Sequence, residues 1–261
     1  VMNYCIILIT TMMSIHQAKD LPFEIERFTV ADRPAFVMLP EKSKRTTPQP
    51  WILYAPNLPG YPDKHESWMH QKFLDAGVAV AGVDIGEAYG NPKGKITFSA
   101  LHQELVNKRQ FAQKPCLFGR SRGGLWVTSW AADNPEKVSG IIGIYPVFDF
   151  RTYPGITKAA PAYGLSPDEL KARSKEFNPI EKVHLLARAM IPATLIHGDD
   201  DKVVPLKENS QAFLEAYQKE KQEGLVKLII LKGQGHNFFE GFFKSQEIVD
   251  FAIIKAKNSS P

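Results

Sequence analysis

The chain has 261 residues, with 32 Lys and Arg against 28 Asp and Glu and a formal net charge of +4. Hydrophobic residues make up 44% and charged residues 23% of it, which excludes an intrinsically disordered chain. The two cysteines exclude a disulfide framework and a cysteine-based zinc site, and the spread-out charge argues against nucleic-acid binding. The length suits one large α/β domain, which we expect over residues 19–261.

An uncharged apolar run, CIILITTMMSI, occupies residues 5–15. It is too short to span a bilayer as a helix, so we expect no stable membrane anchor, but its length matches the core of a signal peptide. No Lys or Arg precedes the run, and His16 is a poor residue two positions before a cleavage after Ala18. We take residues 1–18 as a candidate signal peptide, which slightly favours export over a cytoplasmic location. The alternative is an N-terminal strand or helix packed on the domain.

Strands and helices then alternate along the chain. Hydrophobic patterns and turn residues predict, in order, strands at 23–30, 35–39 and 51–55, a helix at 65–76, a strand at 78–84, a helix at 99–110, a strand at 115–118, a helix at 125–132, strands at 138–145 and 193–197, a helix at 206–221, a strand at 226–231 and a helix at 243–255. A hairpin followed by repeated β–α units predicts an α/β fold. Its sheet is mostly parallel with an N-terminal antiparallel hairpin, and helices cover both faces.

Residues 146–190 interrupt this alternation, because they contain no predicted strand. Ser166 with Pro167 and Glu169 predicts the start of a short helix there. Ligands of open α/β sheets bind at the carboxyl edge, so we interpret the stretch as a lid insertion over that edge. An ordinary long crossover is the alternative. Some of its apolar side chains should line the mouth of the pocket: Tyr153, Tyr163, Leu165 and Leu170.

The segment Gly119-Arg120-Ser121-Arg122-Gly123 follows a predicted strand and precedes a predicted helix. A G-x-S-x-G nucleophile elbow requires that context, because a sharp turn from strand to helix lifts the serine hydroxyl out of the sheet. The motif alone is weak, but in this context it makes Ser121 the candidate nucleophile.

Two further motifs follow later strands. Residues 197–205 read HGDDDKVVP, and residues 233–236 read GQGH. The first follows a buried strand and the second follows the next strand, so an aspartate and His236 would lie on loops at the carboxyl edge and reach Ser121. The order serine, acid, histidine is that of α/β-hydrolases. The alternatives are a solvated turn for the aspartates and a packed loop residue for His236.

On these motifs the chain resembles the α/β-hydrolase family over about residues 23–256. Within the family it is most similar to dienelactone-hydrolase-like and prolyl-oligopeptidase-like members, including bacterial esterases. The family's acid motif, His-Gly-x-x-Asp-x-x-Val-Pro, implies that Asp201 is the acid and that Asp199 and Asp200 occupy variable positions. Some hydrolases place their acid after an earlier strand, so Asp149 stays an alternative acid and is otherwise interpreted as an anchor of the lid.

The resemblance implies a mechanism. Ser121 would attack an acyl carbonyl, His236 would accept the serine proton, and Asp201 would orient the histidine. One oxyanion donor would be the backbone N–H of Arg122, the residue after the nucleophile.

The second oxyanion donor would come from residues 56–60, which read PNLPG. Pro56 and Pro59 have no N–H, and alignment with the family's loop favours Leu58, with Asn57 as the fallback. The loop departs from the His-Gly form of many members.

Two arginines flank the nucleophile. Arg120 and Arg122 could each form a structural ion pair, or one could bind a substrate anion or the oxyanion. Glucuronoyl esterases also carry Ser-Arg at the elbow, a likeness limited to that short segment. We assign Arg120 to substrate binding, together with Tyr153 and Tyr163.

The leading hypothesis is a serine esterase that forms an acyl-enzyme on a small-molecule or carbohydrate-linked ester. A prolyl-oligopeptidase-like peptidase is the alternative. Such enzymes commonly carry an N-terminal propeller, whereas the roughly 120 residues before Ser121 are needed here for the sheet. A non-catalytic binding protein is a third hypothesis, and thioesterase or haloperoxidase chemistry stays open. No metal motif, dinucleotide fingerprint or P-loop occurs in the sequence, so neither a metal nor a cofactor is expected. The oligomeric state does not follow from the sequence.

Overall fold

The computed structural model of the chain describes residues 23–258. The candidate signal peptide, residues 1–18, lies outside them. Within residues 23–258, no helix is both long and apolar enough to cross a lipid bilayer.

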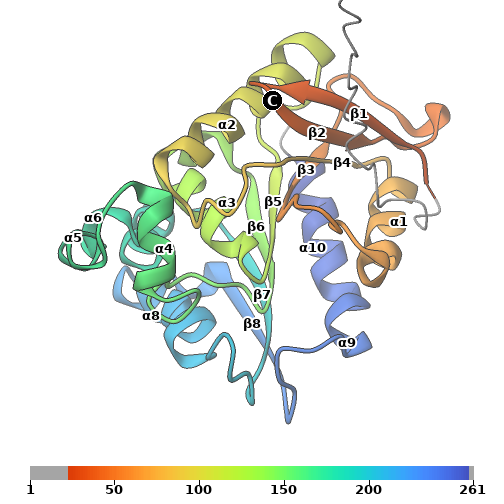
Figure 1. Cartoon of the computed structure of the whole chain (residues 1–261). Coiled ribbons are helices and arrows are strands. Elements are labelled where there is room, and N and C mark those ends of the chain that lie inside the picture. The colour runs from red at the N-terminus through yellow and green to blue at the C-terminus, as the bar shows by residue number, and fades with distance from the viewer. Residues whose placement is uncertain (1–22, 259–261) are drawn as a thin grey trace, which may run out of the picture.

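One eight-stranded sheet forms the centre of the molecule (Figure 1). The strand order is β1-β2-β4-β3-β5-β6-β7-β8. β2 pairs antiparallel with β1 and β4, and every other pair is parallel. The predicted mostly parallel sheet with its N-terminal antiparallel hairpin is therefore confirmed. The strands are β1 (Ile25–Val30), β2 (Arg33–Met38), β3 (Trp51–Ala55), β4 (Ala79–Val83), β5 (Cys116–Arg120), β6 (Gly140–Ile144), β7 (Ala193–Gly198) and β8 (Val226–Leu231).

Helices cover both faces of the sheet, as predicted. Successive residues of a strand point to opposite faces, so Trp51, Leu53 and Ala55 pack into one core and Ile52 and Tyr54 into the other. α2, α3 and α8 cover the first face, and α1 and α10 the second (Figure 1). The helices are α1 (Ser67–Asp75), α2 (Pro92–Gln103), α3 (Gly123–Asp133), α4 (Ile156–Tyr163), α5 (Pro167–Ala172), α6 (Ser174–Phe177), α7 (Val183–Arg188), α8 (Ala212–Lys219), α9 (Glu240–Phe243) and α10 (Gln246–Lys257).

Helix caps explain where the predicted boundaries were wrong. α2 begins at Pro92 and not at residue 99, because the Asn91 side chain accepts the N–H of Gly94 at 2.8 Å and proline suits the first helical position. The helix predicted at 243–255 is α10, which begins only at Gln246 because Ser245 caps it, and the short helix α9 that precedes it was not predicted. The helix predicted at 206–221 begins instead as a π-helical turn, Lys207–Gln211, that leads into α8.

The insertion at residues 146–190 contains α4 to α7, and α5 begins at the predicted capping box. α7 packs against α3 and α8. α4, α5 and α6 lie on the same side of the sheet as α2 and α8 (Figure 1). α4 also contacts the loop that follows β4: Tyr163 O–H donates to the carbonyl of Tyr89 at 2.7 Å, and Asn91 Nδ2 donates to the carbonyl of Ala162 at 2.5 Å. The insertion is thus fixed to a loop at the carboxyl edge of the sheet.

Candidate active site

The candidate nucleophile lies in a tight turn between β5 and α3. Ser121 has a φ of 49°, in the left-handed region that side chains other than glycine rarely adopt. The turn is closed by glycines: a Cβ on Gly119 would lie 2.9 Å from Gly124 Cα, and one on Gly123 would lie 2.2 Å from the carbonyl oxygen of Ala55. Only glycine fits these close approaches, so the motif folds in the strand–turn–helix context that its spacing predicts.

A continuous hydrogen-bonded chain joins three loops at the carboxyl edge of the sheet. Ser121 Oγ lies 2.9 Å from His236 Nε2, and His236 Nδ1 lies 2.7 Å from Asp201 Oδ2. An ionised carboxylate only accepts, so Nδ1 carries the proton. Nε2 of a neutral His236 is therefore the acceptor for the Ser121 hydroxyl. The structure brings together the three residues that the sequence motifs single out.

Asp201 is buried and fully hydrogen-bonded. Its Oδ1 accepts the backbone N–H groups of Val203 at 2.9 Å and Val204 at 2.8 Å. Burial acts to raise the pKa of Asp201, but the adjacent His197, whose Nε2 lies 3.5 Å from Oδ2, and the hydrogen bonds from His236 and the Val204 N–H outweigh it and hold the pKa below its ordinary value. Asp201 is therefore ionised at neutral pH.

The two neighbouring aspartates bind other groups. Asp199 accepts the N–H of Gly233 at 2.6 Å, and Asp200 pairs with Lys202 at 2.6 Å. Neither contacts His236, in agreement with their assignment to variable positions of the motif.

His197 braces the loop that carries Asp201, a role that the sequence analysis missed. It is buried, its Nδ1 lies 2.8 Å from Ser210 Oγ, and its Nε2 lies 2.8 Å from the carbonyl oxygen of Val204. Because a carbonyl only accepts, Nε2 is the protonated nitrogen and donates to Val204. The position of His197 at the start of the acid motif is the signal that could have identified it.

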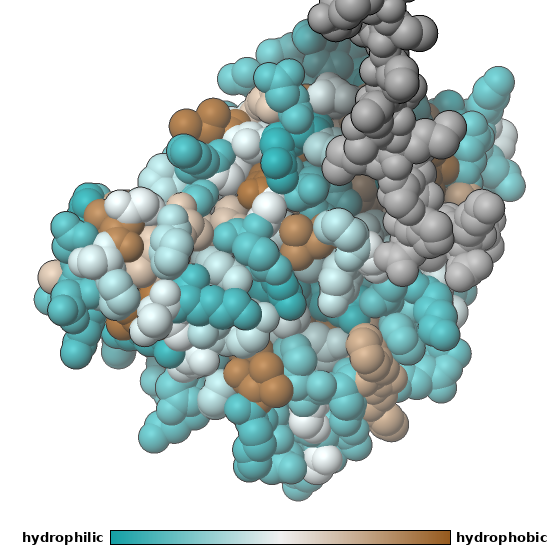
Figure 2. All heavy atoms as spheres, viewed as in Figure 1, coloured by the Kyte–Doolittle hydropathy of each residue, from teal (hydrophilic) through white to brown (hydrophobic). Residues whose placement is uncertain are grey.

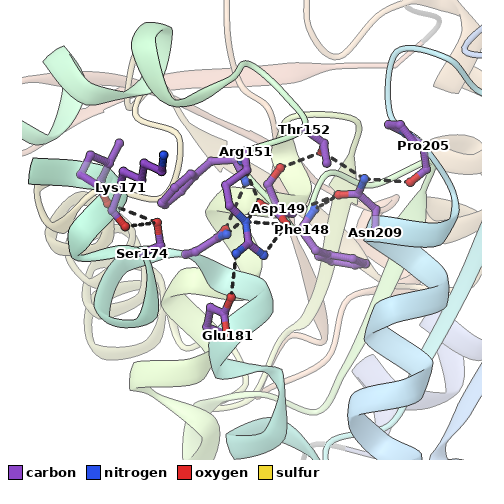
Figure 3. A network of polar contacts seen from close by, with 12 residues as sticks. Phe148, Asp149, Arg151, Thr152, Lys171, Ser174, Glu181, Pro205 and Asn209 are labelled. Carbon is purple, nitrogen blue, oxygen red and sulfur yellow. Dashed lines mark hydrogen bonds and ion pairs between the residues drawn. The ribbon is translucent and has the colours of Figure 1, made fainter. Parts of the chain in front are cut away.

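Asp149, the alternative acid, lies in a different network (Figure 3). Its Oδ1 accepts from Asn178 Nδ2 at 2.7 Å, and its Oδ2 accepts from Arg151 Nη2 at 2.6 Å. Arg151 in turn pairs with Glu181 at 3.1 Å. Asp149 therefore ties the beginning of the insertion to its later part and is not the partner of His236.

Asn209 connects the insertion to the loop of the acid motif (Figure 3). Its Oδ1 accepts the backbone N–H groups of Phe148 at 2.8 Å and Asp149 at 3.1 Å. Its Nδ2 donates to the carbonyl of Pro205 at 2.9 Å and to Thr152 Oγ1 at 3.2 Å. One buried amide thus fixes the end of the acid loop against the segment that leads to Tyr153.

A pocket of about 210 Å³ opens beside Ser121. Of the predicted substrate-binding residues, Arg120 and Tyr153 line it and Tyr163 does not. Tyr163 packs within the insertion against Phe150 and Phe177 and is not part of the pocket lining. Its assignment to substrate binding therefore has no support from the pocket. Leu170 is likewise buried in the core. The lining also contains residues that the sequence analysis did not select: Tyr61, Tyr145, Val203, Asn237 and Phe238.

The predicted oxyanion donors lie on adjacent segments. Gly123 packs directly on the carbonyl of Ala55, so the loop after β3 lies against the start of α3. Neither the N–H of Arg122 nor that of Leu58 has a hydrogen-bond partner among residues 23–258. The loop lines the pocket through Tyr61, and Leu58 is not part of the lining.

Both arginine side chains beside Ser121 pair with carboxylates. Arg120 is buried and lies 2.9 Å from Asp63 Oδ2 and 3.0 Å from Glu66 Oε2. Arg122 pairs with Glu87, and its Cζ lies 5.7 Å from the ring centre of Tyr153. The structure thus shows the ion-paired alternative for both guanidinium groups.

Solved structures share the fold at low sequence identity. Porphyromonas gingivalis dipeptidyl peptidase 4 has a TM-score of 0.67 at 18% identity, over 90% of this chain and 35% of that chain. The Pyrococcus horikoshii acylaminoacyl peptidase has a TM-score of 0.67 at 16% identity, over 88% of this chain and 41% of that chain. Est1E from Butyrivibrio proteoclasticus has a TM-score of 0.65 at 18% identity, over 90% of this chain and 99% of that chain.

The chain thus spans well under half the length of these peptidase chains. The likeness confirms the α/β-hydrolase fold. No curated protein matches the chain in sequence. The prolyl oligopeptidase family matches over residues 97–252, which is more than half of the chain and includes all three motifs. The chain therefore belongs to the prolyl oligopeptidase family of serine hydrolases.

Proposed function

We propose that the protein hydrolyses carboxylic esters, with Ser121 as nucleophile, His236 as general base and Asp201 as the acid that orients it. The observation that carries this proposal is the hydrogen-bonded chain of 2.9 Å and 2.7 Å from Ser121 through His236 to Asp201. The strained turn at Ser121 supports it, because strained backbone clusters at functional sites.

The proposed reaction proceeds in two halves. His236 Nε2 accepts the proton of Ser121 as Oγ attacks the acyl carbonyl, and the imidazolium then protonates the leaving alcohol. Water repeats these steps on the acyl-enzyme and releases the acid. Ionised Asp201 stabilises the imidazolium in both halves. The N–H groups of Arg122 and Leu58 are the proposed donors to the oxyanion.

The pocket favours a small ester without a negative charge. Its volume of about 210 Å³ is below the roughly 300–1,000 Å³ typical of sites for drug-sized ligands. Both guanidinium groups in its wall already pair with carboxylates, so neither is available to a substrate anion without losing a partner. We propose a small-molecule ester, or a carbohydrate-linked ester whose acyl group enters the pocket.

Peptide hydrolysis is the second candidate. The family match and the two peptidases of the same fold favour it, because the same three residues can protonate an amine leaving group. A panel of 4-nitrophenyl esters and proline 4-nitroanilides, compared by kcat/KM, decides between the two. Faster turnover of the proline amides at matched acyl groups would replace the ester proposal.

Fluorophosphonate labelling tests the proposed nucleophile. We expect the wild-type protein to react at a single site, and Ser121→Ala to abolish both labelling and ester hydrolysis. Ser210→Ala is the control, since Ser210 contacts His197 and not His236. Labelling that persists in Ser121→Ala would reject Ser121 as the nucleophile.

The Arg122 side chain provides a test of substrate charge. Its partner Glu87 is 44% exposed, and such surface pairs are worth about 0.2–1 kcal/mol. We therefore expect Arg122→Ala to lower thermal stability slightly and to reduce kcat/KM by equal factors on a neutral ester and on the matching uronate ester. A selective loss on the uronate, on the order of ten- to a hundredfold, would show that the guanidinium binds an anion.

A further inference from the structure

Arg120, the residue before the nucleophile, is the centre of a buried charged cluster. Its side chain is 3% exposed and lies between Asp63, which is 23% exposed, and Glu66, which is fully buried. Glu66 also accepts hydrogen bonds from the Tyr54 hydroxyl at 2.9 Å and from the Asp63 N–H at 3.1 Å. Both carboxylates lie at the far end of the loop that leaves β3.

Three aromatic rings pack on the same guanidinium, one from the loop after β3 and two from the segment that follows His236. The Cζ of Arg120 lies 5.1 Å from the ring centre of Tyr61, 5.0 Å from that of Phe243 and 5.5 Å from that of Phe238. Phe238 follows His236 by two residues. It also stacks on His65, with 4.1 Å between the centres of the two rings. Arg120 therefore contacts both the loop after β3 and the loop of the candidate base.

The loop after β3, residues 56–62, is held at both ends by residues that flank the nucleophile. At its start, the carbonyl of Ala55 lies against Gly123. At its end, Asp63 pairs with Arg120 at 2.9 Å. The loop that we propose to supply the second oxyanion donor is thus fixed directly to the turn that carries Ser121.

We propose that Arg120 is a positioning residue that holds this loop at the distance from Ser121 that the oxyanion requires, and not a residue that binds substrate. The inference rests on the proposed function. A donor misplaced by about 1 Å can cost roughly a hundredfold in rate. The Arg120–Asp63 pair, which we call the clamp, would therefore act on the transition state and leave ground-state binding of the substrate nearly unchanged.

Asp63 is the partner to change, because removing buried Arg120 or Glu66 would leave a buried charge without its counter-ion and destabilise the fold. Asp63→Asn keeps an acceptor for the His65 N–H, which Asp63 caps at 2.9 Å, but it removes the charge that ties Arg120 to the end of the loop and leaves Glu66 as its counter-ion. Arg120→Lys is the second variant, since it keeps the positive charge but loses the planar group that bridges two carboxylates.

Asp84→Asn is a closely matched control. Asp84 also accepts the backbone N–H two residues later, from Gly86 at 2.7 Å, and pairs with an arginine, Arg33, at 2.9 Å. Its side chain is 22% exposed against 23% for Asp63. The control removes an ion pair from a loop that does not line the pocket, although its arginine is 41% exposed against 3% for Arg120.

The experiment measures kcat and KM for 4-nitrophenyl acetate and Ki for phenylboronic acid, which forms a tetrahedral adduct with an active serine. We expect Asp63→Asn and Arg120→Lys to lower kcat by roughly ten- to a hundredfold, to raise Ki by a similar factor and to change KM by less than about twofold. Asp84→Asn should match the wild type in all three, with a smaller loss of thermal stability, because its partner Arg33 is far more exposed than Arg120.

Three results would overturn the proposal. An increase of KM alone would show that Arg120 binds substrate. A lower kcat with unchanged Ki would place its effect outside the oxyanion site. Wild-type values in Asp63→Asn and Arg120→Lys would show that the clamp is dispensable. A wild-type protein that neither hydrolyses the ester nor reacts with a fluorophosphonate would instead reject the proposed function, and the inference with it.

Discussion

Asp201→Asn should lower kcat for 4-nitrophenyl acetate by about three to four orders of magnitude, the size of effect known for the triad aspartate of serine proteases. The asparagine side chain can donate to His236 Nδ1, which stabilises the tautomer that carries its proton on Nε2. Nε2 then no longer accepts the proton of Ser121. The neutral amide also stops stabilising the imidazolium that forms during the reaction.

Two other aspartates control for this variant. Asp200→Asn removes only an exposed pair with Lys202, and Asp149→Asn removes the network that anchors the insertion. We expect both variants to keep fluorophosphonate reactivity within about tenfold of the wild type. A collapse of activity in Asp149→Asn beside a nearly normal Asp201→Asn would reverse the assignment of the acid.

The strands and the turn at Ser121 were predictable because their signals are local. A buried run such as residues 51–55 is apolar along its whole length, and the glycines of the turn are fixed by contacts within the motif itself and with β3. The motif at 197–205 likewise places Asp201, because its carboxylate is held by the N–H groups two and three residues later. Such patterns are readable without knowledge of the tertiary structure.

The surroundings of the nucleophile were not predictable, because they depend on contacts between residues far apart in the sequence. Arg120 meets Asp63, which lies 57 residues earlier, and nothing in the local sequence distinguishes this arginine from one that faces a substrate. Tyr163 was assigned to the pocket for its apolar ring, but its hydroxyl is used by the carbonyl of Tyr89, 74 residues earlier. The side chains of an insertion cannot be assigned to a pocket before its packing is known.

Gly123→Ala should disable the site by a purely steric route. The new Cβ would lie 2.2 Å from the carbonyl oxygen of Ala55, 2.4 Å from its carbonyl carbon and 2.7 Å from the nitrogen of Pro56. All three are backbone atoms, so no change of rotamer relieves the contact, and α3 must separate from the loop after β3. We expect a loss of about 1–3 kcal/mol in the free energy of unfolding and roughly a hundredfold in kcat/KM.

Gly224→Ala is the control for this steric argument, because a Cβ at Gly224 meets no atom within 4 Å and its backbone is not in the left-handed region. Urea denaturation gives the loss of stability, and titration with a fluorophosphonate counts the active sites, so kcat per site separates misfolding from a displaced oxyanion donor. This contact holds the start of the loop against the turn, as the Arg120–Asp63 pair holds its end, so a smaller kcat per titrated site is the expected signature. Wild-type kcat per site in Gly123→Ala would show that the loop after β3 does not serve the reaction, and the second donor would then have to lie elsewhere.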